Sequence, residues 1–438
     1  MTTTETEPTP ARKRDTGTDA RLIIAARGLR SFGYGMLAVL LGVVLSAAGL
    51  TPVAIGALIT VSLVGDFCGT YLIGVYADRW GRRRTLVVLA LLMAATGAIF
   101  GLTAVYPVLL VAAFVGTLGT SGSETAPFLP IEQAMLPQTG APERRTALFA
   151  RYNLVATFAA AGGALVAGLP DLLTQAGVPL AAGVRLLFGL YTLVALIVVL
   201  LVRRLSPQVE LRGLPSRSVV TGWQRLVPPL GRSRGIILRL SALFSVDALA
   251  GGLTVQSLMA LYFHLRFGVP LAPLAALFFG ANTLAALSFL AAAPLARRFG
   301  LLNTMVFTHL PSNVLLALVA VMPTFPLAAA VLLARQLLSQ MDVPTRQAYT
   351  MALVAPEERT AAASVTSLAR SAGSASSPIL SGLLLQGPLL VLGLPFVLAG
   401  GIKVAYDLTL WAVFRRVDAA EVRGNARTAA SAPRRRGA

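Results

Sequence analysis

Long apolar runs separated by short polar segments make up most of this chain. Six runs lie between residues 22 and 202, and six more lie between 236 and 414. A helix needs about 20 mostly apolar residues to cross a bilayer, so the pattern predicts an all-α integral membrane protein with twelve transmembrane helices. The expected spans are 22–50, 51–77, 85–104, 107–136, 146–169, 185–202, 236–263, 271–296, 304–323, 326–352, 361–385 and 390–414.

The polar segments divide the chain into two halves. Residues 1–21 form an N-terminal tail, and a basic tail closes the chain at 415–438. A polar, arginine-rich linker at 203–235 separates a predicted N-terminal six-helix bundle, 22–202, from a C-terminal one, 236–414.

The basic residues are placed asymmetrically. If the spans alternate, 28 Lys and Arg residues fall in the segments on the side of the termini, and one, Arg266, falls in the loops on the other side. Positive charge marks the cytoplasmic side of membrane proteins, so we expect a multi-pass protein of the plasma or inner membrane with both termini in the cytoplasm. This placement explains most of the net charge of +19 through contact with anionic lipid, without a nucleic-acid partner.

Composition excludes several classes of protein. The chain is 56% hydrophobic and 13% charged, whereas soluble domains carry about 25% charged residues. No catalytic constellation and no ATP-binding motif is visible, so we predict a protein that is not an enzyme and draws on an ion gradient. One cysteine and two histidines give no basis for a metal site, and we predict no cofactor.

The two halves also resemble each other in sequence. Residues 130–169 align without gaps with 344–383, and the matches include Pro-x-x-Gln-Ala and Pro-Glu-x-Arg-Thr-Ala. A second pair of similar segments, 77–81 and 296–300, lies at an offset of 219. The repeat predicts two bundles of the same orientation, related by a pseudo-two-fold axis along the membrane normal, which is a transporter plan.

Residues 74–84 read GVYADRWGRRR. This segment resembles the loop 2–3 signature of the major facilitator superfamily, roughly G-x-x-x-D-R-x-G-R-[RK], and with twelve spans and a central linker the resemblance covers nearly the whole chain. It implies a central cavity, alternating access and a small-molecule substrate.

The signature segment is also the predicted conformational switch. Asp78 is expected to meet the positive amino-terminal end of the eleventh span near 360–364, as a latch between the halves. The alternative is that the segment determines only folding and topology. The predicted switch residues are Gly74, Asp78, Arg79, Gly81, Arg82 and Arg83.

Ionisable residues at membrane depth are functional candidates. The resemblance implies that spans 1, 4, 7 and 10 line the cavity, which gives as candidates for substrate or proton binding Tyr34, Glu124, Asp247, Gln256, Arg335, Gln340 and Asp342. Proton coupling is expected through Glu124, Asp247 or Asp342. The alternative is a static pair between Asp342 and Arg335. The glycine- and proline-containing stretch around Glu124 predicts an irregular fourth span.

Further charges are expected in pairs or at the membrane surface. Glu132 and Arg346 occupy equivalent repeat positions and are predicted to form an inner gate between the halves; the loop arginines are the other partners expected for Glu132. Lys403 and Asp407, spaced i,i+4, are expected to neutralise each other. Arg27 and Arg30 are expected to snorkel to the membrane surface, and His309 is expected to be a packed polar residue.

The function predicted from these features is proton-coupled efflux, by antiport, of a small organic molecule or drug, carried out by a monomer of a bacterial, efflux-like subgroup. The fifth span has glycines but lacks the Gly-Pro pair common in antiporters, and the fourth lacks Arg-x-x-Gln-Gly. A proton-coupled uptake symporter is therefore the alternative. A transporter-like scaffold without transport is the second alternative.

Overall fold

The computed structural model describes residues 16–120, 127–139, 145–210, 233–354 and 358–416. Within these ranges the chain is helical and contains no strand. Nine of the described helical segments are long and apolar enough to cross a membrane. The other three predicted spans are built from pairs of shorter helices. The predicted twelve-span, all-helical fold is thus confirmed.

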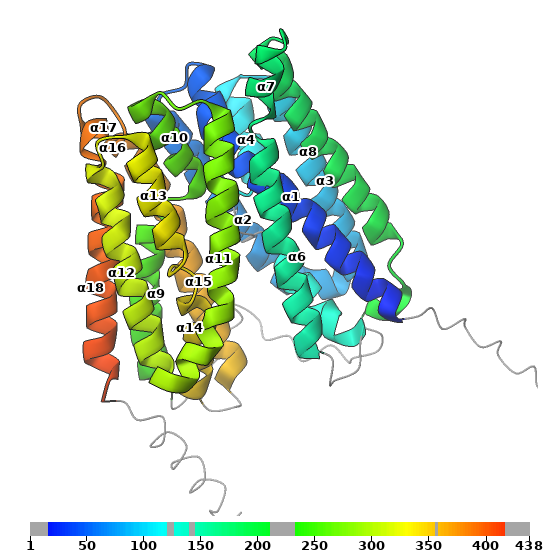
Figure 1. The fold of residues 1–438 in the computed structure, drawn as a ribbon. Coiled ribbons are helices and arrows are strands. Elements are labelled where there is room, and N and C mark those ends of the chain that lie inside the picture. The colour runs from blue at the N-terminus through cyan, green and yellow to red at the C-terminus, as the bar shows by residue number, and fades with distance from the viewer. Residues whose placement is uncertain (1–15, 121–126, 140–144, 211–232, 355–357, 417–438) are drawn as a thin grey trace, which may run out of the picture.

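The N-terminal half forms one bundle of helices, on the right in Figure 1. Its helices are α1 (Thr16–Ala47), α2 (Pro52–Trp80), α3 (Arg82–Leu102), α4 (Tyr106–Val115), α5 (Phe128–Met135), α6 (Arg145–Val166), α7 (Leu169–Gln175) and α8 (Leu180–Arg203). Two short 3₁₀ turns accompany them, η1 (Leu136–Thr139) and η3 (Pro207–Val209).

The C-terminal half forms the second bundle, on the left in Figure 1. Its helices are α9 (Arg234–Leu253), α10 (Gln256–Phe267), α11 (Leu271–Phe299), α12 (Leu301–Val321), α13 (Phe325–Gln336), α14 (Asp342–Ala352), α15 (Arg359–Ser376), α16 (Pro378–Leu384), α17 (Leu389–Leu392) and α18 (Leu394–Phe414).

The internal repeat is visible in how the helices pack. In the N-terminal half α1 packs on α6 and α3 on α8; in the C-terminal half α9 packs on α15 and α12 on α18. In both halves, therefore, the first span lies on the fifth and the third on the sixth. Glycine permits the closest approaches: a Cβ on Gly163 of α6 would lie 1.8 Å from the carbonyl oxygen of Phe32, and one on Gly373 of α15 would lie 2.3 Å from that of Ser245.

Four of the spans are interrupted within the membrane. The breaks separate α4 from α5, α9 from α10, α13 from α14, and α15 from α16. The first follows the expectation of an irregular fourth span: α4 stops at Gly116, and Gly119 has a φ of +61° that favours glycine. Broken backbone is tolerated at membrane depth where it is buried in protein or lines a cavity.

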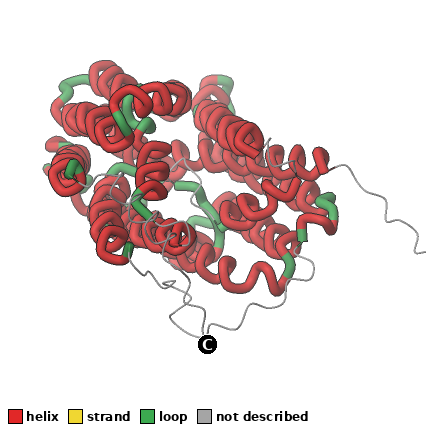
Figure 2. The backbone as a smooth tube through the Cα atoms, turned by 90° about the horizontal axis from the view of Figure 1, so that it is seen from below, coloured by secondary structure: helices red, strands yellow, loops and turns green. Residues whose placement is uncertain are grey.

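The halves are joined away from the chain termini. We call the end that holds the start of α1 and the end of α18 the termini end, which Figure 2 shows in front, and the other the opposite end. The main inter-half packing is α6 on α11, α2 on α15 and α16, and α1 on α10. A Cβ on Gly56 would lie 2.5 Å from the carbonyl oxygen of Pro378, and one on Gly382 would lie 2.4 Å from that of Pro52. Glycine therefore sets the spacing of α2 and α16 near the opposite end.

Candidate functional site

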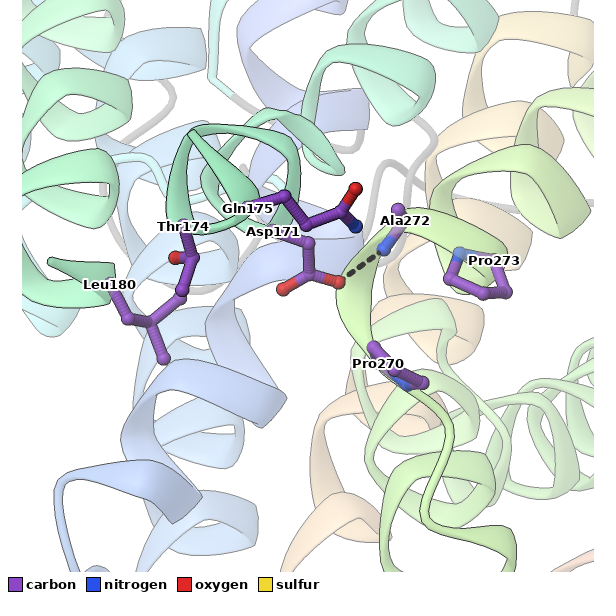
Figure 3. Close-up of a pocket in the computed structure, with 7 residues that line it drawn as sticks. All are labelled: Asp171, Thr174, Gln175, Leu180, Pro270, Ala272 and Pro273. Atoms are coloured by element: carbon purple, nitrogen blue, oxygen red, sulfur yellow. Dashed lines mark hydrogen bonds between the residues drawn. The ribbon is translucent and has the colours of Figure 1, made fainter. Parts of the chain in front are cut away.

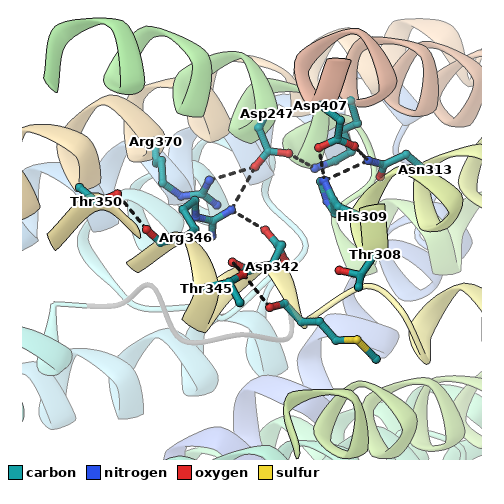
Figure 4. Close-up of polar contacts among 12 residues, drawn as sticks. Asp247, Thr308, His309, Asn313, Asp342, Thr345, Arg346, Thr350, Arg370 and Asp407 are labelled. Atoms are coloured by element: carbon teal, nitrogen blue, oxygen red, sulfur yellow. Dashed lines mark hydrogen bonds and ion pairs between the residues drawn. The ribbon is translucent and has the colours of Figure 1, made fainter. Parts of the chain in front are cut away.

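A cluster of buried charges in the C-terminal half is centred on Asp247 of α9 (Figure 4). This side chain is 3% exposed. Its Oδ1 accepts a hydrogen bond from Lys403 Nζ of α18 at 2.5 Å, and its Oδ2 accepts one from Arg370 Nη1 of α15 at 2.9 Å. Arg346 Nη1 of α14 lies 3.6 Å from Oδ2. One carboxylate therefore joins four helices.

Arg346 links this carboxylate to a second one. Its Nη1 donates to Asp342 Oδ2 at 2.7 Å, one turn earlier on α14. The break between α13 and α14 places Asp342 in the first turn of α14, where the helix dipole favours a negative charge. The guanidinium carbon also lies 5.6 Å from the ring centre of Phe244 on α9.

A third carboxylate has neutral or titratable partners. Asp407 of α18 is fully buried. Its Oδ1 lies 3.0 Å from His309 Nδ1, and its Oδ2 accepts from Asn313 Nδ2 at 2.8 Å, both from α12. No Lys or Arg of the described ranges forms an ion pair with it.

Several predicted pairings are replaced by others. Lys403 contacts Asp247 on α9 and Asp407 contacts His309 on α12, so the expected i,i+4 pair between them is not formed. The two side chains leave α18 toward different neighbours. Arg335 does not pair with Asp342 either; its Nη1 lies 3.3 Å from Gln336 Oε1.

The structure does not bring the predicted inner-gate residues together. Glu132 of α5 binds Arg30 of α1 through two hydrogen bonds of 2.7 and 2.6 Å, and it accepts a third from Tyr152 of α6 at 2.8 Å. Arg346 pairs within the C-terminal half instead. Repeat-equivalent positions occupy equivalent places in separate bundles, and here each finds its counter-charge in its own bundle.

Arg30 is therefore not a snorkelling residue. Its side chain is 0% exposed, and its guanidinium carbon lies 4.1 Å from the ring centre of Phe128. Arg27 is buried too and lies over the ring of Tyr152, at 5.0 Å from the centroid. The sequence showed two arginines near a helix start, but not the carboxylate and the two rings that surround them.

The other predicted cavity residues lie on the interrupted spans or face them. Tyr34 is buried against Gly119, where a Cβ would lie 2.3 Å from its ring. Gln256 is the first residue of α10 and is buried. Gln340 is half-buried in the turn between α13 and α14. Glu124 lies outside the described residues.

The signature segment forms the turn between α2 and α3. Gly81 has a φ of +95° and ends one helix while it starts the next. The backbone N–H groups of Arg82 and Arg83 donate to the two carboxylate oxygens of Glu210, at 2.8 and 3.0 Å. Arg83 Nη2 also donates to the carbonyl of Arg203 at 2.8 Å. The remaining switch residues, Gly74, Asp78 and Arg79, belong to α2, and their surroundings lie outside the described part of the structure.

Sequence reasoning missed Glu210 and Asp171. Glu210 is the one acid in an arginine-rich linker, and it caps the first two residues of α3. Asp171 of α7 accepts a hydrogen bond from the backbone N–H of Ala272, in the first turn of α11, at 2.7 Å (Figure 3). A carboxylate after a Gly-Leu-Pro step at the end of the fifth span was the available signal.

The Asp171 contact lies beside a pocket between the halves. The pocket has a volume of about 450 Å³ and is lined by Asp171, Thr174, Gln175, Leu180, Pro270, Ala272 and Pro273. It belongs to the opposite end, where α7 of one half meets α11 of the other. Asp171 thus provides a charged side chain that hydrogen-bonds across the two halves.

Comparisons with known proteins agree with this architecture. The sequence profile described as Major Facilitator Superfamily matches residues 23–339. Uncharacterized membrane protein YJR124C of Saccharomyces cerevisiae is 28% identical over 429 residues, which cover 92% of this chain and 95% of that protein.

Solved structures share the fold at low identity. The nucleoside transporter NupG has a TM-score of 0.66 at 15% identity, covering 91% of this chain and 98% of that one. A D-xylose-proton symporter has a TM-score of 0.66 at 16% identity, with coverage of 90% and 97%. The human organic anion transporter MFSD10 has a TM-score of 0.62 at 16% identity, with coverage of 91% and 100%.

Proposed function

This chain belongs to the Major Facilitator Superfamily, and we propose that it is a proton-coupled transporter of a small organic molecule. The family and the fold identify a multi-pass secondary transporter that works by alternating access, and not an enzyme. The coupling ion, the direction and the substrate are the subjects of the proposal.

The observation that carries proton coupling is the contact of Asp407 with His309 and Asn313. Asp247 faces three cations and Asp342 holds Arg346, so both are already neutralised. A buried carboxylate at membrane depth without a cation in contact is a proton-binding candidate. His309, as a neighbouring titratable group, can exchange a proton with it. We therefore propose Asp407 in place of Asp247 and Asp342 as the coupling residue, while Glu124, the third predicted candidate, lies outside the described residues.

Asp66 of α2 is a second carboxylate of this kind. It is buried, its Oδ1 has no hydrogen-bond partner, and no Lys or Arg of the described ranges pairs with it. Asp407 is the stronger candidate because Lys403, one turn away on α18, also binds Asp247. A proton on Asp407 changes the charge beside a cluster that holds α9, α14, α15 and α18 together.

We consider two directions of substrate transport. The sequence favours efflux by antiport from a plasma or inner membrane with both termini in the cytoplasm. Uptake by symport is favoured by one structural observation: Arg335 contacts no carboxylate among the described residues, and its Nε is buried without a hydrogen-bond partner. A guanidinium without a counter-charge favours binding of an anionic substrate together with a proton, as developed below. Each chain contains one complete pair of bundles, so we propose a functional monomer.

Reconstituted liposomes with a lumenal pH dye test this proposal. We would add a panel of organic acids, sugars, amino acids and drugs to wild type and to Asp407→Asn, Asp66→Asn and Thr409→Ala. Thr409 is exposed on the same helix as Asp407 and serves as the matched control. Wild type and Thr409→Ala should move protons when one compound is added, and the sign of that movement distinguishes antiport from symport.

Asp407→Asn should keep exchange of labelled for unlabelled substrate but lose proton movement and uphill accumulation. Unchanged proton movement in Asp407→Asn would remove Asp407 from the coupling mechanism, and its loss in Asp66→Asn alone would move the site to the N-terminal half. Absence of labelled exchange and of proton movement across the whole panel would favour the scaffold alternative.

A further inference from the structure

Arg335 has no counter-charge in contact with it. It lies in the last turn of α13, which begins at Phe325 at the opposite end. Ten residues of helix place it about 15 Å deep, near the middle of a hydrocarbon core about 30 Å thick. Its Nη1 lies 3.3 Å from Gln336 Oε1, and its Nε is buried without a hydrogen-bond partner. No carboxylate of the described residues lies within 4.0 Å of it.

The buried carboxylates of this half have other partners. Lys403, Arg370 and Arg346 all contact Asp247, and Arg346 also holds Asp342. The third buried carboxylate, Asp407, contacts His309 and Asn313. Arg335 is therefore left without a counter-charge, and a buried charge without a partner is costly.

The guanidinium of Arg335 also has an unused hydrogen-bond donor, because its Nε is buried without an acceptor. A Cβ on Gly280 of α11 would lie 3.3 Å from Leu333 of α13, so the two helices are adjacent at this level. A site with an unneutralised guanidinium and an unused N–H donor is suited to a ligand that supplies acceptors and negative charge.

We propose that Arg335 binds the acid group, a carboxylate or a phosphate, of the transported molecule, so that the substrates are small organic anions. This inference rests on the proposed transport function. Bound substrate would supply the missing negative charge opposite Arg335. The planar guanidinium offers two parallel N–H donors to such a group.

Binding of an anion at Arg335 would also be thermodynamically linked to binding of the proton. A bound anion raises the affinity of nearby groups for a proton, and a bound proton raises the affinity for the anion, by the reciprocity of linked binding. Proton and substrate would therefore bind together at this half, which is the condition for symport.

A binding measurement tests the site without requiring transport. We would measure thermal unfolding of the detergent-purified full chain with about 10 mM of matched probes at constant ionic strength. The probes are benzoate against benzamide, glycerol phosphate against glycerol, and benzylammonium as a cation. The variants are Arg335→Gln, Arg335→Lys and, as a control, Arg239→Gln, whose arginine is exposed on α9.

At least one acid should raise the Tm of wild type and of Arg239→Gln, more strongly at acidic than at neutral pH, whereas the amide, glycerol and the ammonium probe should not. In Arg335→Gln the acid concentration needed for half of the shift should rise about tenfold or more, and Arg335→Lys should keep part of the response. If Arg335 only stabilises the carboxyl-terminal end of α13, Arg335→Gln should change the Tm of the ligand-free protein but leave the acid-induced shift in Tm intact.

The inference is overturned if neither acid shifts the Tm, if the neutral or cationic probes act equally, or if Arg335→Gln keeps the full response. Acid binding with no flux in liposomes would contradict the proposed function and leave this site standing. Proton-coupled flux of a neutral or cationic compound alone would contradict this site and leave the proposed function standing.

Discussion

The hydrogen bond from the first turn of α11 to Asp171 is expected to hold the opposite end of the transporter closed. Asp171 belongs to the N-terminal half and its donor, the backbone N–H of Ala272, to the C-terminal half, with 2.7 Å between Oδ2 and nitrogen. The halves of an alternating-access transporter must separate at this end once in each cycle. Asp171→Asn removes the negative charge but keeps an acceptor, and Asp171→Ala removes both.

The size of the effect follows from this geometry. A carboxylate at a helix amino terminus stabilises by about 0.3–1 kcal/mol when exposed and up to about 2 kcal/mol when partly buried. Asp171 is half-buried, so we expect Asp171→Asn to weaken the closed state by about 1 kcal/mol, or about fivefold in population. Asp171→Ala should weaken it by about 2 kcal/mol, or about thirtyfold.

Spin-label distances across the opposite end measure these populations. The labels would be placed at Ala176 and Thr324, which are exposed there on the two halves, after replacement of the one native cysteine by Cys68→Ala. Gln175→Ala is the matched control, because Gln175 lines the same pocket without a hydrogen bond across it. Both Asp171 variants should shift the distance distribution toward longer values, the alanine variant more, and the control should not.

An unchanged distribution in both Asp171 variants would refute this reasoning. It would mean that the close packing of α2 on α16 and α6 on α11 determines the closed state, and that the charged contact adds nothing measurable. A shift of equal size in Gln175→Ala would refute it as well, since that change leaves the hydrogen bond intact.

Three other predictions concern contacts inside and between the halves. Glu132→Gln leaves Arg30 buried without its counter-charge and should lower the free energy of unfolding by about 3–5 kcal/mol, measured as a lower Tm in detergent. The double variant Glu132→Leu, Arg30→Met should restore the Tm if the unpaired charge is the cause, and an unchanged Tm in Glu132→Gln would contradict this prediction. Gly56→Val places a branched side chain against the carbonyl of Pro378, 2.5 Å from the new Cβ, and should enlarge the distance between spin labels at the opposite end. A distance distribution like that of wild type would show that α2 shifts to accommodate the side chain without opening this end. Asp78→Asn should abolish substrate exchange while membrane insertion stays normal, and wild-type exchange rates in that variant would rule out a latch at the termini end.

The helices and their number could be predicted because lipid imposes a simple rule. Every backbone polar group must be satisfied within a span, so apolar length alone identified the twelve spans. The irregular fourth span was also predictable, since its glycines and prolines are local features. The break between α13 and α14 has a weaker signal: the residues 337–341 include neither Gly nor Pro, and Pro344 lies in the first turn of α14, where proline is tolerated. The residues at the break itself therefore did not reveal its position.

The pairing of charges could not be predicted, because it depends on the rotation of each helix. Lys403 and Asp407 share a helix face in projection, yet one reaches α9 and the other α12. Glu132 had two expected partners, the loop arginines and Arg346, and instead binds Arg30, which had been assigned to the membrane surface. The sequence named nearly all of the buried charges but not their contacts.

The distribution of ion pairs has a consequence for the cost of the transport cycle. The ion pairs named above each join residues of one half: Arg30 with Glu132 in the first, and the clusters around Asp247 and Asp407 in the second. Breaking a buried ion pair costs about 3–5 kcal/mol, and none of these needs to break when the halves tilt. The charge networks inside the two bundles can thus stay intact through the cycle, so proton and substrate need not supply the energy of breaking them.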